Sequence, residues 1–141
     1  MTDLTGLKVL FVAGFGPVVR EAPVSAALYR DALRLPLEAM PNDPDYLHGE
    51  ALTGVKHFAL WPLASAADSC FGTKRWPDDV PVPQAWLEFD VEDVAAASAV
   101  LKARGYQLLV DNRTEPWGQT VTRLLSPEGI LVGITFTPWL R

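Results

Sequence analysis

The sequence predicts an α+β fold in which a β-α-β-β-β pattern occurs twice along one chain. Two observations favour this fold. Short runs rich in β-branched and aromatic residues, bounded by glycine, proline, asparagine and aspartate, recur in the same order around two helical segments. With 141 residues, 49% of them hydrophobic, the chain can also bury roughly two thirds of its unfolded surface and form one domain over residues 1–141.

Residues 7–62 are the first predicted module. Residues 7–19 form a strand that becomes irregular after Gly14, because glycine weakens the interior of a strand. Pro23 suits the first turn of a helix over residues 22–33, where good helix formers follow. The remaining elements of this module are a short strand and a hairpin, at residues 37–39, 46–52 and 55–62.

The second predicted module covers residues 84–137 and follows a connection at residues 63–83. The connection consists of a short helix at residues 64–71 and a linker at 72–83, which is rich in proline and aspartate. The helix of the second module, at residues 92–104, is rich in alanine and is ended by a glycine, which favours helix termination. Its strands are predicted at residues 84–91, 107–112, 119–125 and 130–137.

Charge and cysteine content exclude several classes of protein. The net charge of −5 and the pI near 4.9 argue against binding to nucleic acid or to an anionic membrane surface, which both require a basic patch. Cys70 is the single cysteine, so no internal disulfide can form and a reducing compartment is favoured. The N-terminus lacks the charged and apolar regions of a signal peptide. We therefore expect a cytoplasmic protein that has neither a nucleic-acid nor a membrane partner.

Three segments carry motif-like sequences. They are AALYRDALRLPL at residues 26–37, LEFDVEDV at 87–94, and EPWG at 115–118 followed by SPEG at 126–129. In order and spacing they resemble the vicinal oxygen chelate superfamily, which includes glyoxalase I, bleomycin-resistance proteins and extradiol dioxygenases. The resemblance implies two modules whose mixed sheets curl around a central cleft, with helices on the outer face. It also implies a homodimer, because clefts of this family are commonly completed by a second chain.

Strand 84–91 has one apolar face and one mixed face. The apolar face, predicted to pack under the helices, consists of Ala85, Leu87, Phe89 and Val91. The mixed face consists of Gln84, Trp86, Glu88 and Asp90. A solvated face does not need a tryptophan, so Trp86 serves either as cross-strand core packing or as a platform for a ligand. The sequence leaves both alternatives open.

The two histidines fall in different contexts. His57 and Trp61 share the face of strand 55–62 that is predicted to line the cleft, and they offer one hydrogen-bonding group and one stacking group. A single histidine on a strand is either a satisfied structural group or a functional one, and both interpretations of His57 remain. His48 lies near a predicted turn and is expected at the surface.

A metal centre of the family type is not expected. The resemblance implies four ligands, from the first and last strands of each module, yet strand 7–19 contains no histidine, glutamate, aspartate or glutamine. The third and fourth ligand positions fall on Trp86 and Gly133, which leaves only His57. Other catalytic motifs are also missing, and Cys70 is expected to be an inert packed thiol. We therefore predict no metal, no cofactor and no catalytic residue.

The resulting functional hypothesis is a metal-free protein that sequesters an aromatic or hydrophobic small molecule, such as an antibiotic, as bleomycin-resistance proteins do. Flat aromatic faces suit such ligands and also attract cations. The predicted ligand-binding residues are His57, Trp61, Trp76, Trp86, Glu88 and Trp117, with Trp76 in the linker as a lid. One alternative is a metal-dependent lyase or dioxygenase with an atypical site formed by His57, Gln84 and Glu88. Another is a housekeeping or regulatory domain whose cleft is merely core.

Overall fold

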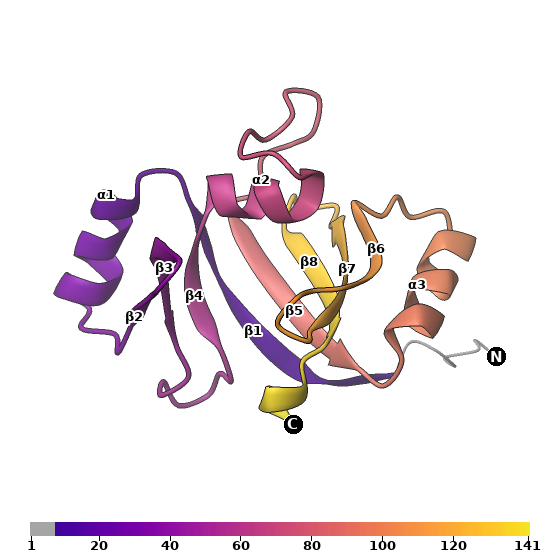
Figure 1. Cartoon of the computed structure of the whole chain (residues 1–141), viewed down its shortest axis with the longest axis horizontal. Coiled ribbons are helices and arrows are strands. Elements are labelled where there is room, and N and C mark those ends of the chain that lie inside the picture. Colours follow the sequence, from indigo (N-terminus) through magenta and orange to yellow (C-terminus); the bar gives the residue numbers. More distant parts are fainter. Residues whose placement is uncertain (1–7) are drawn as a thin grey trace.

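A computed structural model describes residues 8–141, and in it a single mixed sheet of eight strands curls around a cavity (Figure 1). The order of the strands is β2-β3-β4-β1-β5-β8-β7-β6. The first four strands are β1 (Val9–Val19), β2 (Glu38–Met40), β3 (Asp43–Gly49) and β4 (Phe58–Pro62). The other four are β5 (Ala85–Val91), β6 (Val110–Thr114), β7 (Thr120–Leu125) and β8 (Leu131–Phe136).

The two halves of the sheet meet at the antiparallel pair of β1 and β5. On its other side β1 pairs in parallel with β4, and β5 pairs in parallel with β8. From the centre outwards, each half therefore presents its first, fourth, third and second strand. The predicted α+β fold of two βαβββ modules is confirmed, with both modules joined in one curled, open sheet.

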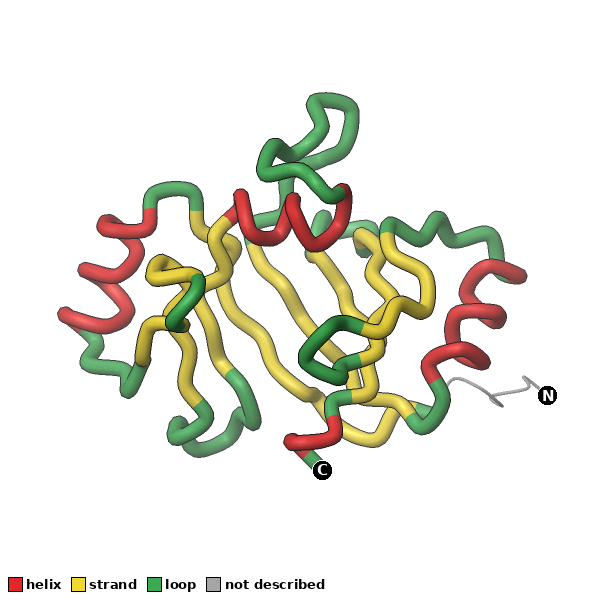
Figure 2. Tube along the Cα trace, viewed as in Figure 1, coloured by secondary structure: helices red, strands yellow, loops and turns green. Residues whose placement is uncertain are grey.

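The helices lie around this sheet (Figure 2). They are α1 (Ala22–Ala26), the π-helical segment η1 (Ala27–Ala32), α2 (Leu63–Phe71), α3 (Val94–Ala103) and the short η2 (Pro138–Leu140). Pro23 lies in the first turn of α1, where its missing N–H costs nothing. Asp93 caps α3 by accepting a hydrogen bond from the Ala96 N–H at 3.0 Å. Among residues 8–141, no helix is long and apolar enough to cross a membrane.

The helices do not cover the middle of the outer face, which corrects one prediction. α1 packs on β4, whereas α3 packs on β6, β7 and β8, so the two helices lie at opposite ends of the sheet (Figure 1). Leu87 and Phe89, predicted to pack under helices, are consequently only half-buried. Their cross-strand neighbours on β1, Phe15 and Val12, are exposed. The central strands thus present apolar side chains on the outer face.

Several element boundaries also differ from the prediction. β3 begins at Asp43 instead of residue 46, and β4 begins at Phe58 instead of residue 55. The last pair between these strands joins Gly49 to Phe58, so residues 50–57 form a wide connection that includes the left-handed Gly54. The predicted module start at Leu7 and the N-terminal segment considered for a signal peptide lie outside the described residues.

Candidate functional site

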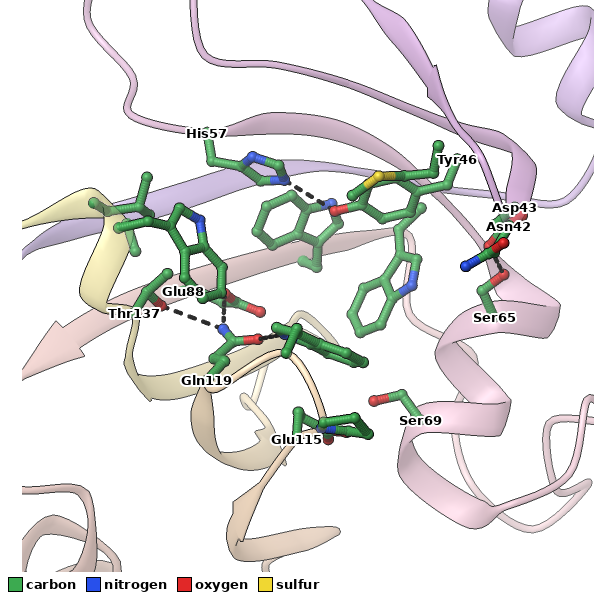
Figure 3. A pocket seen from close by; sticks show the side chains of 18 of the residues that line it. Asn42, Asp43, Tyr46, His57, Ser65, Ser69, Glu88, Glu115, Gln119 and Thr137 are labelled. Atoms are coloured by element: carbon green, nitrogen blue, oxygen red, sulfur yellow. Dashed lines mark hydrogen bonds between the residues drawn. The ribbon is translucent and has the colours of Figure 1, made fainter.

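A cavity of about 940 Å³ lies on the concave side of the sheet, between the two modules. Its walls come from β1, β3, β4, β5 and β7, from α2, and from the loop around Trp117. Of the predicted binding residues, the structure brings together His57, Trp61, Trp86, Glu88 and Trp117 around this cavity. Figure 3 shows the polar side chains that point into it from both modules.

Trp86 forms part of the cavity wall and is also packed into the sheet. Only 3% of its surface is exposed, and its Nε1–H donates to the Ala59 carbonyl at 3.0 Å. The ring lies across β1, where an added Cβ at Gly14 or Gly16 would come within 2.9 or 3.0 Å of it. The two glycines therefore make room for the indole. Core packing and cavity lining, open alternatives in the sequence, describe two sides of the same ring.

Trp61 extends this aromatic wall and contacts a buried charge. Its ring meets Trp86 edge-on, with the centroids 6.2 Å apart and the planes at 84°. The Arg123 guanidinium lies 4.7 Å from the Trp61 ring centre and donates to the Glu88 carboxylate at 2.9 Å. Gln119 donates to the other oxygen of Glu88 at 3.2 Å. Because Arg123 is only 3% exposed, this ion pair keeps a buried charge neutralised.

Next to Trp86 on the cavity wall, His57 connects Tyr46 to Glu50. The carboxylate of Glu50 can only accept, so His57 donates from Nδ1 to Oε1 of Glu50 at 2.7 Å. In the neutral ring Nε2 is then an acceptor, and the Tyr46 hydroxyl donates to it at 2.9 Å (Figure 3). Burial, reinforced by the nearby Glu88 carboxylate, raises the pKa of Tyr46 far above its usual value. Tyr46 therefore remains a hydrogen-bond donor at neutral pH.

Two predicted positions need correction. Trp76 is not a lid and does not line the cavity; it is buried, donates to the Val80 carbonyl at 3.0 Å, and packs edge-on against Phe71. The linker folds onto the core because the indole of Trp76 anchors it there. His48 is not a surface residue either, because only 18% of its side chain is exposed and its Nδ1 lies 3.4 Å from Oε1 of Glu50.

The rim of the cavity contains further aromatic and charged groups. Trp117 is 57% exposed and its Nε1–H donates to Gln119 at 3.0 Å. Trp139, just before the C-terminus, also lines the cavity and is largely exposed. The sequence did not single out Trp139, Arg113 or Arg123. The sequence of β7 could have indicated Arg123, because it is the one charged residue in a strand that otherwise contains only threonine, valine and leucine.

Comparison with known proteins places the chain in a family. The family model described as the Glyoxalase/Bleomycin resistance protein/Dioxygenase superfamily matches residues 1–134. The chain belongs to this superfamily. This match confirms the resemblance to the vicinal oxygen chelate superfamily that the sequence motifs indicated.

Solved structures show the same fold in other superfamily members. A glyoxalase/bleomycin resistance protein/dioxygenase superfamily member from Vibrio splendidus 12B01 is 15% identical, with a TM-score of 0.58 over 89% of this chain and 97% of that one. Methylmalonyl-CoA epimerase from Mycobacterium tuberculosis is 18% identical, with a TM-score of 0.56 over 94% of this chain and 91% of that one. No curated protein matches the chain by sequence. At such identities the similarity concerns the fold alone.

The residues at the centre of the cavity do not fit the metal ion of the superfamily's metalloenzymes. Ala13, the residue of β1 that lines the cavity, has no donor atom. The Trp86 indole lies across β1, and its one polar group is already bonded to Ala59. At Gly133 an added Cβ would meet Glu88 Cγ at 2.7 Å, so the neighbouring glutamate occupies that space. Gln84 is exposed and outside the cavity lining, so the atypical ligand set that includes it is not assembled.

Proposed function

We propose that this superfamily member binds an aromatic or hydrophobic small molecule in the central cavity, without a metal ion between its modules, and sequesters it. An antibiotic is one such ligand. The observation that carries the proposal is a cavity of about 940 Å³ lined by Trp61, Trp86 and Trp117, in which Trp86 occupies a position where the family resemblance implies a metal ligand. Cavities of this size bind drug-sized molecules mainly through apolar and aromatic walls.

The charges around the cavity favour a ligand with a positive group. Five carboxylates and two guanidinium groups line it, from Asp43, Glu50, Asp68, Glu88, Glu115, Arg113 and Arg123. Each arginine pairs with one carboxylate: Arg123 with Glu88 at 2.9 Å, and Arg113 with Glu115 at 2.7 Å. Three carboxylates remain without a guanidinium partner among these residues. The resulting negative potential and the exposed indole faces both attract cations.

The test is a titration with matched aromatic probes after the chain has been treated with a chelator. An aminomethyl-naphthalene, a neutral hydroxymethyl-naphthalene and a naphthoate share one ring system and differ in charge. We expect saturable quenching of tryptophan fluorescence with affinity in the order cation, neutral molecule, anion. Trp61→Ala should weaken all probes that bind, whereas Trp76→Phe, outside the cavity, should not. Failure of every probe to bind contradicts the proposal, and binding that requires added divalent metal favours the lyase or dioxygenase alternative.

A second copy of the chain is the partner that we propose. Val12 and Phe15 are 46% and 44% exposed, and they pair directly with the half-buried Phe89 and Leu87. These four apolar side chains form one patch at the junction of the modules, on the outer face between the helices. Burial of this patch against its own copy would remove it from water, and an isologous interface needs only a self-complementary surface.

A cytoplasmic location, favoured by the single cysteine, is part of the same proposal.

A further inference from the structure

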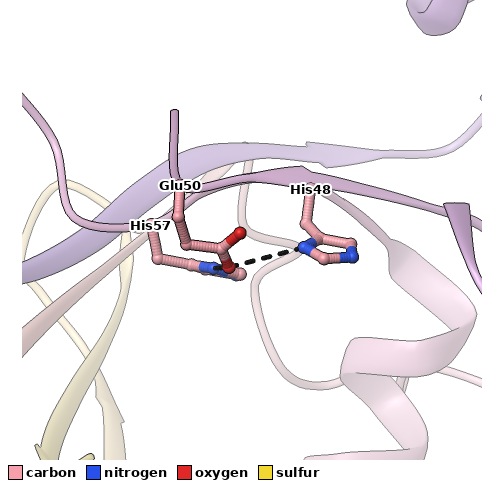
Figure 4. Close-up of side chains that lie close together, drawn as sticks. All are labelled: His48, Glu50 and His57. Carbon is pink, nitrogen blue, oxygen red and sulfur yellow. Dashed lines mark hydrogen bonds and ion pairs between the residues drawn. The ribbon is translucent and has the colours of Figure 1, made fainter. Parts of the chain in front are cut away.

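His48, Glu50 and His57 direct their polar atoms toward one another beside the cavity (Figure 4). One donor atom from each residue lies within 4.8 Å of the other two. Glu50 stands between the two rings, with its Oε1 at 2.7 Å from His57 Nδ1 and 3.4 Å from His48 Nδ1. The two imidazole rings stack at a centroid distance of 5.8 Å.

The hairpin of β3 and β4 produces this arrangement. His48 lies in β3 and Glu50 directly follows Gly49, the last residue of that strand, and both side chains lie beside His57. His48 pairs with Ala59 and Gly49 with Phe58, so the next step of the register brings His57 opposite Glu50. All three groups therefore come from one hairpin of the first module. β1, β5 and β8, where the superfamily resemblance places three of the four metal ligands, contribute none of them. His57 directly precedes β4 and falls on the remaining family position, whereas His48 and Glu50 belong to no position of that set.

One nitrogen of this cluster has no hydrogen-bond partner. His48 Nδ1 is buried, and within residues 8–141 the only other buried side-chain polar atom in that condition is Arg123 Nε. A buried polar atom without a partner loses its hydrogen bonds to water without replacement, so native proteins rarely retain one that has no role. Here the unpartnered nitrogen lies next to a carboxylate and a second imidazole. A cation between the three groups would give this nitrogen a partner.

We propose that His48, Glu50 and His57 form a binding site for a divalent transition metal ion such as Zn²⁺, Ni²⁺ or Co²⁺. Two imidazole nitrogens and one carboxylate oxygen are the ligands that these ions prefer, whereas Mg²⁺ and Ca²⁺ require oxygen donors. Bonds of about 2.0–2.2 Å place ligand atoms up to ~4 Å apart, so rotations of the side chains bring the three donors into range. Nδ1 of both histidines and a carboxylate oxygen of Glu50 would bind the ion.

Tyr46 supports the proposed site through a hydrogen bond with the second ring nitrogen of His57. When His57 binds a metal through Nδ1, its Nε2 carries the ring proton and can donate to the Tyr46 oxygen, which lies at 2.9 Å. Histidine ligands in metal sites typically donate their second ring N–H in this way, and the hydrogen bond orients the ring. Glu50 and His57 also line the cavity, so an ion bound by these residues would lie at the cavity wall. The site is separate from the centre of the cavity and does not rest on the proposed ligand binding.

The test uses the fact that the chain has only two histidines, both of which belong to the cluster. The full chain, freed of metal by a chelator and then of the chelator, is titrated with Zn²⁺ while the imidazole nitrogens are followed by NMR. We expect both rings to shift together and to saturate at one ion per chain. Co²⁺ should give the absorption bands of a low-symmetry site at the same stoichiometry. No saturation, or a shift of one ring alone, overturns the proposal.

Variants separate this site from other metal-binding groups of the chain. Glu50→Gln keeps the shape of the side chain but loses the charged donor, and it should weaken Zn²⁺ binding about tenfold or more, as loss of a supporting group does in known sites. His48→Ala should weaken it at least as much. Asp111→Asn, at an exposed carboxylate paired with Lys102, is the matched control and should bind like the parent chain. If Glu50→Gln and the control bind equally well, the ion lies elsewhere and the proposal is wrong.

Discussion

Replacement of Trp86 by alanine tests whether this ring holds the two modules together as well as lining the cavity. The ring lies on β1 at Gly14 and Gly16, donates to the Ala59 carbonyl on β4, and contacts the edge of Trp61. It thus joins a strand of the second module to two strands of the first. Its removal should loosen the junction at which the two halves of the sheet meet.

The size of the loss follows from the buried area. A tryptophan side chain buries roughly 200 Å², and at about 25 cal/mol per Å² this is worth ~5 kcal/mol. The cavity side of the new space can fill with water, which lowers the cost below that of a closed void. Truncation of a buried tryptophan typically costs about 3–5 kcal/mol, so we expect about 3 kcal/mol. Urea unfolding followed by far-UV circular dichroism measures it, because this signal does not depend on the altered tryptophan.

Trp86→Phe is the control for this measurement. It keeps most of the ring on β1 but loses the indole N–H, so it should cost about 1 kcal/mol for the lost hydrogen bond, plus a small packing loss. A loss below about 1 kcal/mol for Trp86→Ala would be too small for a buried aromatic side chain. That result would show that Trp86 is only a cavity surface and that the modules are held together elsewhere.

Three further predictions concern separate parts of the molecule. Arg123→Met should cost about 3–5 kcal/mol in urea unfolding, because it leaves Glu88 without its partner; adding Glu88→Gln should recover much of the loss, and no recovery would contradict the pairing argument. Phe15→Glu should convert the proposed dimer to a monomer in sedimentation velocity, and an unchanged sedimentation coefficient would place the interface elsewhere. Burial raises the pKa of the Cys70 thiol, so the native chain should react slowly with thiol reagents compared with the unfolded chain. The thiol of the unfolded chain ionises at a lower pH than the buried thiol of the folded chain, which favours the unfolded chain as the pH rises above the ordinary thiol pKa. The melting temperature should therefore fall in that pH range, and a rise would contradict the prediction.

The local elements of the fold could be predicted because short-range chemistry determines them. Pro23 begins a helix and Asp93 caps another, both by backbone hydrogen-bonding rules that need no tertiary contact. The coverage of Leu87 and Phe89 could not be predicted in the same way. Alternation indicates which residues share a face, but not which layer covers that face, since this depends on where the helices lie across the sheet.

The candidate site was predictable only along single strands. The alternation along β5 correctly grouped Trp86 with Glu88 on the cavity side, and the same reasoning grouped Trp61 on β4 with His57, which directly precedes that strand. The partners of these groups come from other segments. Arg123 reaches Glu88 from 35 residues away, and no local pattern contains that pairing. Trp76 was misplaced for a similar reason, because a tryptophan in a proline-rich linker can lie either on the surface or, as here, against the core.

The two modules differ in how the charged groups that they contribute to the cavity are paired, and the position of Trp86 contributes to this difference. In a doubled fold, equivalent strands of the two modules present equivalent positions to the centre. Here the indole of Trp86 fills the space over β1, while Gly133 leaves room for the Glu88 side chain, which Arg123 neutralises. The second module therefore contributes a satisfied ion pair and an apolar wall. The polar groups without a guanidinium partner include those of the β3–β4 hairpin in the first module. There Glu50 lies beside the rings of His48 and His57, and Tyr46 forms a hydrogen bond with His57. A ligand held flat against the indoles would accordingly direct its polar group toward this hairpin.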